Sequence, residues 1–443
     1  MKRFLIFIIP FFLISCITIK YQKVFDEIFE DAGKNSSEIK KAIHYFQNSG
    51  NYLQLNSLYY LLENTNGHSY VEYGAISANN DTLQYELENF STYLEAKAAW
   101  DSLESEYGKL NWQPTKEIRD IKIISSKYLI ENVELAYEVW KNKPWSKKYS
   151  FNVFLEYILP YRVDDEPTAK WRRFFLQQFQ GLEKEMQNPY DSIEAANLIN
   201  NKLKSWWDYD EKYSLDPNAR SFMELLRTGE GSINDINIMI LYALRANGIP
   251  STLDFHISNL SFHNNTWIAV IDQEGNTIPI YNWQTDSKKL MEEKISPKVY
   301  RKSYRKQINN LTNIEKDEKL IPPELSGLHF FDVTPFYTKV NDITIEPDII
   351  NYPPPENCKY LFLAIYNKEN WQTIDWAFFK KNSAEFIDLG LPMLYLPCYY
   401  ENKIIPAGKP FILQKNGKLR TLETKENYEE IISNLQKTQS TSK

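Results

Sequence analysis

Apolar residues recur with helical spacing through most of the first 180 positions. The segment 36–46 opens on Ser36-Ser37-Glu38 and then has apolar residues at positions 39, 42, 43 and 46. That start and that spacing are typical of a capped amphipathic helix. The same period continues through 53–62, 83–107 and 124–140, so we predict an α-helical domain over residues 25–178.

The C-terminal third has a different pattern. Short runs rich in β-branched and aromatic residues are separated by Pro, Asn and Gly at intervals of roughly ten residues, which favours an antiparallel β-sandwich over 336–432. The expected strands are 343–345, 360–366, 373–379, 393–400 and 409–413. Asn416-Gly417 predicts a type I′ hairpin turn. The polar tail 433–443 is predicted to be disordered.

The middle of the chain contains one strongly apolar helix. Ser232 and Asp235 form a capping-box pattern in front of the apolar run 236–244, and Gly248 follows the last periodic residue as a stop signal, with Pro250 two residues later. A strand is expected at 251–257. A second helix is expected at 191–207. Together with the two outer regions, these elements indicate an α+β protein.

The succession around this helix resembles a known family. Gly231-Ser232-Ile233-Asn234-Asp235, the apolar helix and Arg245-Ala246-Asn247-Gly248-Ile249-Pro250 are similar to the pattern G-x-C-x-D, helix, LRAxGIP of the transglutaminase-like cysteine domains. Asn265-Thr266-Trp267 resembles the His-x-Trp of that family, and the strand 278–281 resembles the one that ends in its acidic residue. The resemblance implies a papain-like α+β core over 179–285, followed by a connector over 286–335.

The reactive residues of that family are replaced here. Ile233 stands at the Cys position, Asn265 at the His position and Tyr281 at the position of the acid, although Asn282 is one residue away and leaves the last assignment open. A helix N-terminus and an imidazole lower the pKa of a catalytic thiol, and isoleucine has no group for them to act on. We therefore expect a pseudoenzyme with no catalytic residues and no cofactor.

The alternative hypothesis is a hydrolase or acyl-transfer enzyme with a shifted site. Ser232 would be the nucleophile, His263 the base, and Asp254 or Asp272 the carboxylate that orients it. Ser232 already has a capping role. His263 lies two residues from the family position, which along a strand is a displacement of about 6–7 Å.

Other segments of the chain resemble lipoproteins of the Bacteroidetes type that have a transglutaminase-like core. The clearest are 126–132 and 154–162, together with Glu166 and Trp171. Within the segment 154–162, Tyr161 and Arg162 are binding candidates, because an Arg beside aromatic rings can hold an anionic or planar group. Otherwise Arg162 pairs with Asp164, Asp165 or Glu166 and joins the helical domain to the core.

The N-terminus predicts a lipid anchor. Lys2 and Arg3 precede an apolar stretch that is too short to span a membrane, and Leu13-Ile14-Ser15-Cys16 resembles a bacterial lipobox. We expect 1–15 to be a signal peptide, Cys16 to be lipidated and 16–24 to be a tether. The membrane partner is then the bacterial cell envelope, with the outer membrane facing the periplasm favoured and surface exposure left open.

Charge and cysteine content exclude other classes. Without Lys2 and Arg3 the chain has 49 basic and 58 acidic residues, a formal charge of −9, which argues against nucleic acid. Cys358 and Cys398 are either a disulfide or two unrelated thiols. The five histidines form no metal-ligand motif, so no metal is expected.

Aromatic residues suggest a binding function. Trp206 and Trp267 are further candidates. An exposed Trp207 with Tyr209 and Tyr213 would form a stacking platform for a sugar, but packing of these rings between domains is the favoured interpretation. Clustering of Trp206, Tyr209, Tyr161 and Trp267 around an open cleft would favour binding of a glycan or peptide ligand, whereas burial would favour a scaffold. The expected function is thus binding or scaffolding at the cell envelope.

Overall fold

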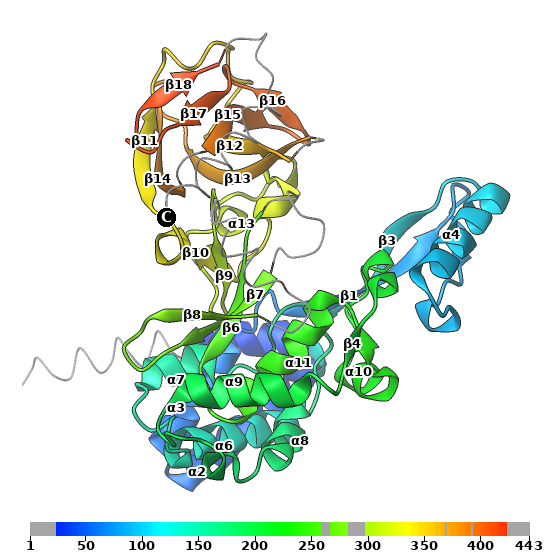
Figure 1. Cartoon of the computed structure of the whole chain (residues 1–443), viewed down its shortest axis with the longest axis vertical. Coiled ribbons are helices and arrows are strands. Elements are labelled where there is room, and N and C mark those ends of the chain that lie inside the picture. Colours follow the sequence, from blue (N-terminus) through cyan, green and yellow to red (C-terminus); the bar gives the residue numbers. More distant parts are fainter. Residues whose placement is uncertain (1–23, 258–265, 282–296, 368–369, 391–392, 423–443) are drawn as a thin grey trace, which may run out of the picture. The chain divides into compact units, whose positions relative to one another are not determined.

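The chain folds into two compact units, each assembled from several stretches of sequence (Figure 1). The computed structural model describes residues 24–257, 266–281, 297–367, 370–390 and 393–422. The first unit comprises Met1–Gln180, Glu211–Arg227 and Arg245–Gly248, and the second comprises Gly181–Asp210, Thr228–Leu244 and Ile249–Lys443. Helices dominate the first unit and antiparallel sheets the second, so the predicted α+β class is confirmed.

Helices α2, α3 and α6 pack against one another in the first unit. Helix α2 buries Ile39, Ala42 and Phe46, as its spacing predicts. Its first turn differs from the prediction of a capped start. Asn35 occupies the cap position but makes no side-chain cap hydrogen bond, and its side-chain amide donates to the carbonyls of Ile121 and Ile124. The helices of this unit include α2 Ser36–Ser49, α3 Tyr52–Glu63, α4 Tyr93–Tyr107, α5 Asp120–Ile123, α6 Ser126–Asn142, α7 Phe151–Tyr157, α8 Trp171–Gln178 and α10 Phe222–Thr228.

A small sheet interrupts this helical region, and here the prediction was wrong. Strand β1 (Ser69–Ile76) pairs with β3 (Asn111–Arg119) over eight positions and with the short β2 (Thr82–Leu83) at its end. Of the helix predicted over 83–107, only α4 forms, and Thr92 caps it by accepting from the Glu95 amide. We call residues 69–119 the arm. Figure 1 shows β1 and β3 leading to α4 at its end.

The second unit contains a five-stranded antiparallel sheet. Its order is β10-β9-β6-β7-β8, and two helices of this unit are α9 (Ser192–Leu203) and α11 (Ile233–Ala246). Strands β9 and β10 come from the range expected to be a connector, so the sheet continues past the predicted core. The strands are β6 Ser251–Phe255, β7 Thr266–Ile271, β8 Thr277–Ile280, β9 Tyr300–Lys302 and β10 Phe330–Asp332, and the short α13 Leu311–Ile314 lies between the last two.

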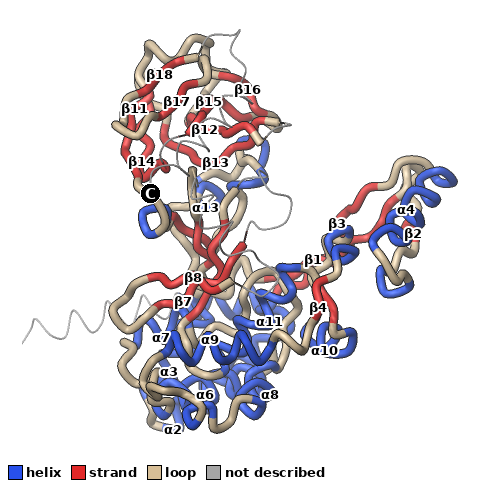
Figure 2. Tube along the Cα trace, viewed as in Figure 1, coloured by secondary structure: helices blue, strands red, loops and turns tan. Residues whose placement is uncertain are grey.

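The C-terminal part of this unit consists of antiparallel strands (Figure 2). Strand β11 pairs with β14, and a larger sheet has the order β13-β12-β15-β17-β18, with β16 on β15. All five predicted strands form, and β14, β16 and β18 add to them. The bounds are β11 Val340–Ile345, β12 Tyr360–Tyr366, β13 Trp371–Phe378, β14 Ala384–Gly390, β15 Met393–Tyr400, β16 Ile404–Pro406, β17 Phe411–Leu413 and β18 Leu419–Thr421.

The predicted hairpin exists, but with another turn. Gly417 has φ of 79°, whereas Asn416 is not among the residues with positive φ, so the turn is not type I′. The Gly417 amide instead donates to the Gln414 carbonyl at 2.8 Å, and the Gln414 amide donates to the Lys418 carbonyl at 2.9 Å. This is a longer loop with a left-handed glycine at its end. Within the described residues no helix combines the length and apolar character that a membrane span requires.

Candidate functional site

The N-terminal end of α11 has the capping box that its sequence predicts. The Ser232 hydroxyl accepts from the Asp235 amide at 3.2 Å, and the Asp235 carboxylate accepts from the Ser232 amide at 2.8 Å and from its hydroxyl at 2.7 Å. Just before it, β5 (Glu230–Gly231) pairs in parallel with β4 (Asp208–Tyr209). The start of this helix is therefore fixed by both backbone pairing and side-chain caps.

Ile233 is the first residue of α11 and is half-buried. It occupies the place where the partial positive charge of a helix N-terminus acts on a side chain. The two described thiols are elsewhere: Cys358 precedes β12 and Cys398 lies within β15, and both are free, so the disulfide alternative was wrong. Burial raises the pKa of both thiols, which disfavours the reactive thiolate.

The C-terminal end of α11 confirms the predicted stop. Gly248 has φ of 74°. Its amide donates to the Arg245 carbonyl at 3.1 Å, and the Ile249 amide donates to the Leu244 carbonyl at 3.0 Å. This pair of bonds is a Schellman motif. A Cβ at Gly248 would lie 2.8 Å from the Ser146 hydroxyl, so both the backbone and the packing require glycine here.

One row of side chains crosses the sheet on a single face. Asp254 on β6 is directly opposite Trp267 on β7 and Arg301 on β9. Opposite residues in antiparallel strands share a face. Asn237, one turn into α11, lies 3.4 Å from both the carbonyl and the hydroxyl of Thr266 at the start of β7. The first turns of α11 therefore lie at the strand end that precedes Trp267.

Asp254 is fully engaged in this row. Its two carboxylate oxygens accept from Arg301 Nε at 2.8 Å and Nη2 at 2.7 Å, and Oδ2 also accepts from the Tyr337 hydroxyl at 2.5 Å. Trp267 Nε1 donates to the same Tyr337 hydroxyl at 3.0 Å. Burial raises the pKa of Asp254 against the opposing effect of Arg301. Both Asp254 and Trp267 thus have structural partners that the sequence analysis did not identify.

The shifted site of the alternative hypothesis is not assembled by the described residues. The Ser232 hydroxyl donates to Asp235, and Asp254 binds Arg301. Asp272 accepts from the amides of Glu274 and Asn276 in the turn between β7 and β8. His263, Asn265 and Asn282 lie outside the described residues, as does Cys16.

Tyr281 follows β8 and packs with the row. Ile280 is opposite Ile268, so the next position along β8 comes beside Trp267. The Tyr281 ring is half-buried against the cluster of Trp267, Val299 and Val333, and its carbonyl accepts from Asn200 on α9 at 3.0 Å. Burial raises its pKa. This residue acts as a packing contact at the end of the sheet.

Tyr161 and Arg162 are buried in the first unit, with exposures of 1 % and 3 %. Arg162 Nε donates to the Asp120 carboxylate at 2.8 Å, and the Tyr161 hydroxyl donates to it at 3.0 Å. Asp120, rather than a neighbouring carboxylate, is the ion-pair partner of Arg162, which hydrogen-bonds the carbonyls of Asp164 and Glu166, although the charge of Glu166 also helps to raise its pKa. Within the first unit, Arg162 thus ties the segment after α7 to Asp120 at the start of α5, 42 positions earlier.

Arg172 is a second buried arginine, which the sequence analysis did not single out. It donates to the carbonyls of Ile158, Leu159 and Pro160 at 2.6, 2.7 and 2.9 Å and to Asn132 at 2.5 Å. Burial, and then the charge of Arg245, lower the pKa of Arg172 to about 9. Arg172 therefore binds the backbone carbonyls that follow α7 and not a carboxylate. No local sequence motif predicts this arrangement.

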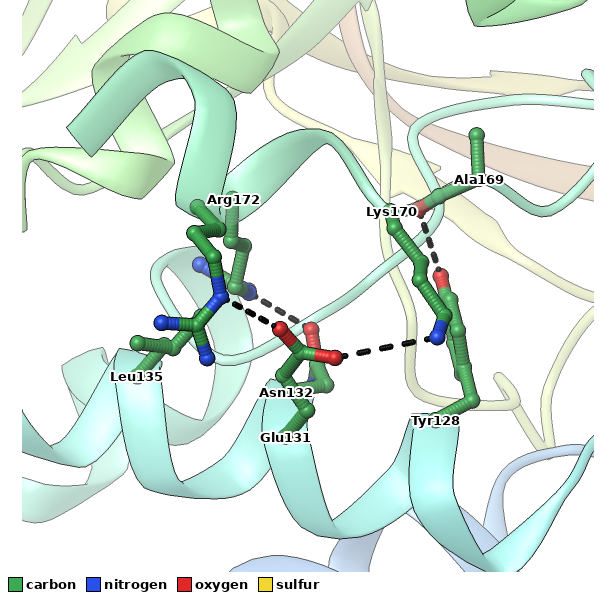
Figure 3. A pocket seen from close by; sticks show the side chains of 8 residues that line it. Tyr128, Glu131, Asn132, Leu135, Ala169, Lys170 and Arg172 are labelled. Carbon is green, nitrogen blue, oxygen red and sulfur yellow. Dashed lines mark hydrogen bonds and ion pairs between the residues drawn. The ribbon is translucent and has the colours of Figure 1, made fainter. Parts of the chain in front are cut away.

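A small cavity lies beside Arg172 (Figure 3). Its volume of about 20 Å³ has room for roughly one water molecule. Figure 3 shows Tyr128, Glu131 and Asn132 on α6 facing Lys170 and Arg172. The Tyr128 hydroxyl donates to the Ala169 carbonyl at 3.0 Å, and Glu131 lies 3.8 Å from the Lys170 ammonium. The segments 126–132 and 154–162 meet where Asn132 and Arg172 both donate to the Leu159 carbonyl, and the cavity beside them is too small for a ligand larger than water.

The tryptophan pair at the end of α9 differs from the prediction. Trp207 and Tyr213 are buried, with exposures of 3 % and 7 %, whereas Trp206 is half-buried. The exposed platform of Trp207, Tyr209 and Tyr213 was therefore wrong. Among the described residues, no group of His, Cys, Asp and Glu side chains has the arrangement of a metal site.

Comparison with known proteins agrees with this geometry. A search of curated proteins and a search of solved structures gave no significant match to the chain. A scan against protein-family models matched residues 180–275 to the transglutaminase-like superfamily. That segment contains the capping box, α11, the Schellman turn, β6 and β7. The chain thus contains a transglutaminase-like superfamily domain at residues 180–275.

Proposed function

We propose that this protein is a lipid-anchored transglutaminase-like pseudoenzyme that acts in binding or scaffolding at the bacterial cell envelope. The observation that carries the proposal is Ile233 at the first position of a capped α11. The capping box and the Schellman turn keep the helix that would activate a nucleophile. The residue placed there has no ionisable group, so a covalent acyl intermediate has no atom on which to form.

The surroundings of Asp254 support the same proposal. A carboxylate that orients a catalytic histidine needs a free oxygen facing the imidazole. Both oxygens of Asp254 are bound by Arg301, and Tyr337 adds a third bond. The Ser232 hydroxyl donates a hydrogen bond to the Asp235 carboxylate, which is part of the helix cap. The serine-hydrolase alternative with Ser232, His263 and Asp254 therefore has little support.

Burial of the aromatic candidates favours a scaffold over glycan stacking at these positions. Tyr161 and Trp267 have exposures of 1 % and 7 %. Their polar atoms bind Asp120 and Tyr337. Of the candidates, Trp206 remains half-buried.

The anchor part of the proposal rests on the sequence around Cys16. It is tested by metabolic labelling with a fatty-acid analogue in a bacterial host. We expect label on the wild-type chain and none on Cys16→Ser, with the variant released from the membrane fraction. Equal labelling of both chains would contradict lipidation at this residue.

The catalytic part is tested by turnover on the purified chain from Cys16 onwards. Incorporation of a fluorescent primary amine into a glutamine-containing protein and hydrolysis of activated esters are measured. We expect the wild type, Ser232→Ala and the double variant Cys358→Ser/Cys398→Ser to match the heat-denatured control. Turnover that requires Ser232 would overturn the pseudoenzyme assignment.

A further inference from the structure

The arm carries most of the net charge of the protein. Residues 69–119 contain nine acidic and four basic side chains, a formal charge of −5, whereas the whole chain has −7. Most residues of β3 are exposed, and the exposed charged residues of α4 are Glu95, Asp101 and Glu106 with a single lysine, Lys97. A surface of one sign attracts partners of the opposite sign and rejects like-charged ones.

The arm also has an apolar groove between α4 and the segment before it. We call this the arm groove; its volume is about 370 Å³. Its lining consists of Gln84, Tyr85, Glu86, Asn89, Phe90, Ala99, Ser102 and Leu103. Phe90, Ala99 and Leu103 are only half-buried and supply apolar surface, while Glu86 is exposed at the rim.

The groove has a preformed floor. Tyr85 is buried, its hydroxyl donates to the Ala96 carbonyl at 2.7 Å, and its ring meets Trp100 edge-on at 5.1 Å. Trp112 Nε1 donates to the Leu215 carbonyl at 3.0 Å. The Asn218 side chain accepts from the Tyr73 amide at 2.7 Å and donates to the Tyr73 carbonyl at 3.0 Å. A rigid groove can bind without a large cost of ordering.

Part of the acidic charge near the groove is already paired, with arginines outside the arm at Glu88 and with a lysine of α4 at Asp101. Glu88 pairs with Arg227 at 2.9 Å and with Arg220 at 3.5 Å, and Asp101 pairs with Lys97 at 2.9 Å. Glu86, Glu95, Glu104 and Glu106 add negative charge on the same segment. The arm groove is therefore an apolar cleft on the acidic surface of the arm.

We propose that the arm groove binds a segment of a partner protein in which one large apolar side chain is flanked by lysines or arginines. The apolar side chain packs on Phe90, Ala99 and Leu103, and the flanking cations face Glu86 and the acidic side of α4. This site belongs to the first unit and does not depend on the proposed loss of catalysis in the transglutaminase-like domain.

The test is a selection from a random peptide display library on the immobilised full-length mature chain. The enriched peptides are then measured by fluorescence anisotropy against wild type, Ala99→Phe, Glu86→Lys and Glu117→Lys. Ala99→Phe fills the groove, and Glu86→Lys reverses a charge at its rim. Glu117→Lys is the matched control, since it makes the same change on β3 away from the groove.

We expect peptides that share a bulky apolar residue next to Lys or Arg, with binding lost in Ala99→Phe. Glu86→Lys should weaken binding about tenfold and Glu117→Lys by less than about twofold. Enrichment of acidic or purely apolar peptides would overturn the proposal, as would equal weakening by the two charge reversals. Self-association of the wild type that Ala99→Phe abolishes would assign the groove to a second copy instead and would equally overturn it.

Discussion

At the scale of single residues, the start of α11 has an isoleucine where an ionisable side chain would interact with the helix N-terminus. Ile233 begins a helix whose first turn is capped by Ser232 and Asp235. A thiol at this position would have its pKa lowered by the helix N-terminus. The native thiols have the opposite environment, because burial raises the pKa of Cys358 and Cys398.

Replacing Ile233 by Cys should therefore create the most reactive thiol of the chain. We expect Ile233→Cys to react with iodoacetamide at neutral pH about tenfold faster than an ordinary exposed thiol, which corresponds to a pKa lowered by about one unit. The pH dependence of alkylation, followed by peptide mass mapping, measures this.

Ile308→Cys is the matched control, because Ile308 is 72 % exposed in a segment outside any helix. If both introduced thiols react with the same pH profile, the start of α11 does not supply the expected electrostatic effect. Amine incorporation should stay absent in Ile233→Cys, since no histidine at position 265 is present to act as base.

Local signals predicted the ends of α11, but distant contacts could not be predicted. The capping box and Gly248 follow from residues within four positions of each other. Asp254 binds Arg301 and Tyr337, which lie 47 and 83 positions away. From the sequence alone, Asp254 could therefore be proposed as a catalytic carboxylate. Its partners Arg301 and Tyr337 become visible only in the folded structure.

At the scale of elements, the arm is the main difference from the sequence prediction. Strand β3 is exposed at most positions, so it has little of the alternation between apolar and polar residues that identifies a half-buried strand. It also contains Pro114, which favours an edge position. The C-terminal strands were easier to predict, since β12 and β15 are buried along almost their whole length.

A carboxylate in front of the C-terminal sheets makes their stability depend on pH. Glu315 accepts from the amides of Asp317 and Lys316, from Lys359 on the segment before β12 and from the Tyr360 hydroxyl. Hydrogen bonds from the Asp317 amide and from Lys359 lower its pKa to about 2. The unfolded value is about 4.3. The stabilisation is thus present above the unfolded pKa and is lost as the pH falls from about 4.3 to about 2.

Glu315→Gln should remove this pH dependence. We expect the variant to be less stable than the wild type at pH 7, with the difference shrinking as the pH falls below about 4.3. Urea unfolding at several pH values measures it. Glu385→Gln, on the exposed side of β14, is the control and should leave the pH profile unchanged. A difference that stays constant down to pH 2 would contradict the role of Glu315.

At the scale of the whole molecule, a buried lysine joins the two sheet regions of the second unit. The Lys298 ammonium, in front of β9, binds Asp332 at the end of β10, lies 3.2 Å from Asp375 on β13 and donates to the Ile387 carbonyl on β14 at 2.7 Å. Burial alone would lower its pKa, but the charges of Asp375 and Asp332 raise it. The lysine is 2 % exposed, so its three contacts replace water.

Removing this cation should destabilise the second unit strongly. Lys298→Met leaves two carboxylates without their partner, and we expect a loss of about 3–5 kcal/mol in the free energy of unfolding. Adding Asp375→Leu should recover part of it. Lys380→Met, at an exposed lysine over the Phe378 ring, should cost less than about 1 kcal/mol. Equal losses in the two lysine variants would show that the cluster contributes nothing specific.

The division into units was beyond a pattern-based prediction. The chain crosses between the two units several times, since Glu211–Arg227 and Arg245–Gly248 belong to the first unit although their neighbours belong to the second. Hydrophobic periodicity describes each element alone and does not tell which elements pack together. The domain limits that we derived from the sequence, each a single continuous range, therefore stay a prediction.

We propose that the transglutaminase-like domain has no working nucleophile. Active-site-directed labelling tests it most directly: the native mature chain is treated with a fluorophosphonate, which reacts with activated serines, and with iodoacetamide, and adducts are located by peptide mass mapping. We expect no adduct on residues 230–235 with either probe. A fluorophosphonate adduct on Ser232, formed in the native but not in the unfolded chain, would contradict it.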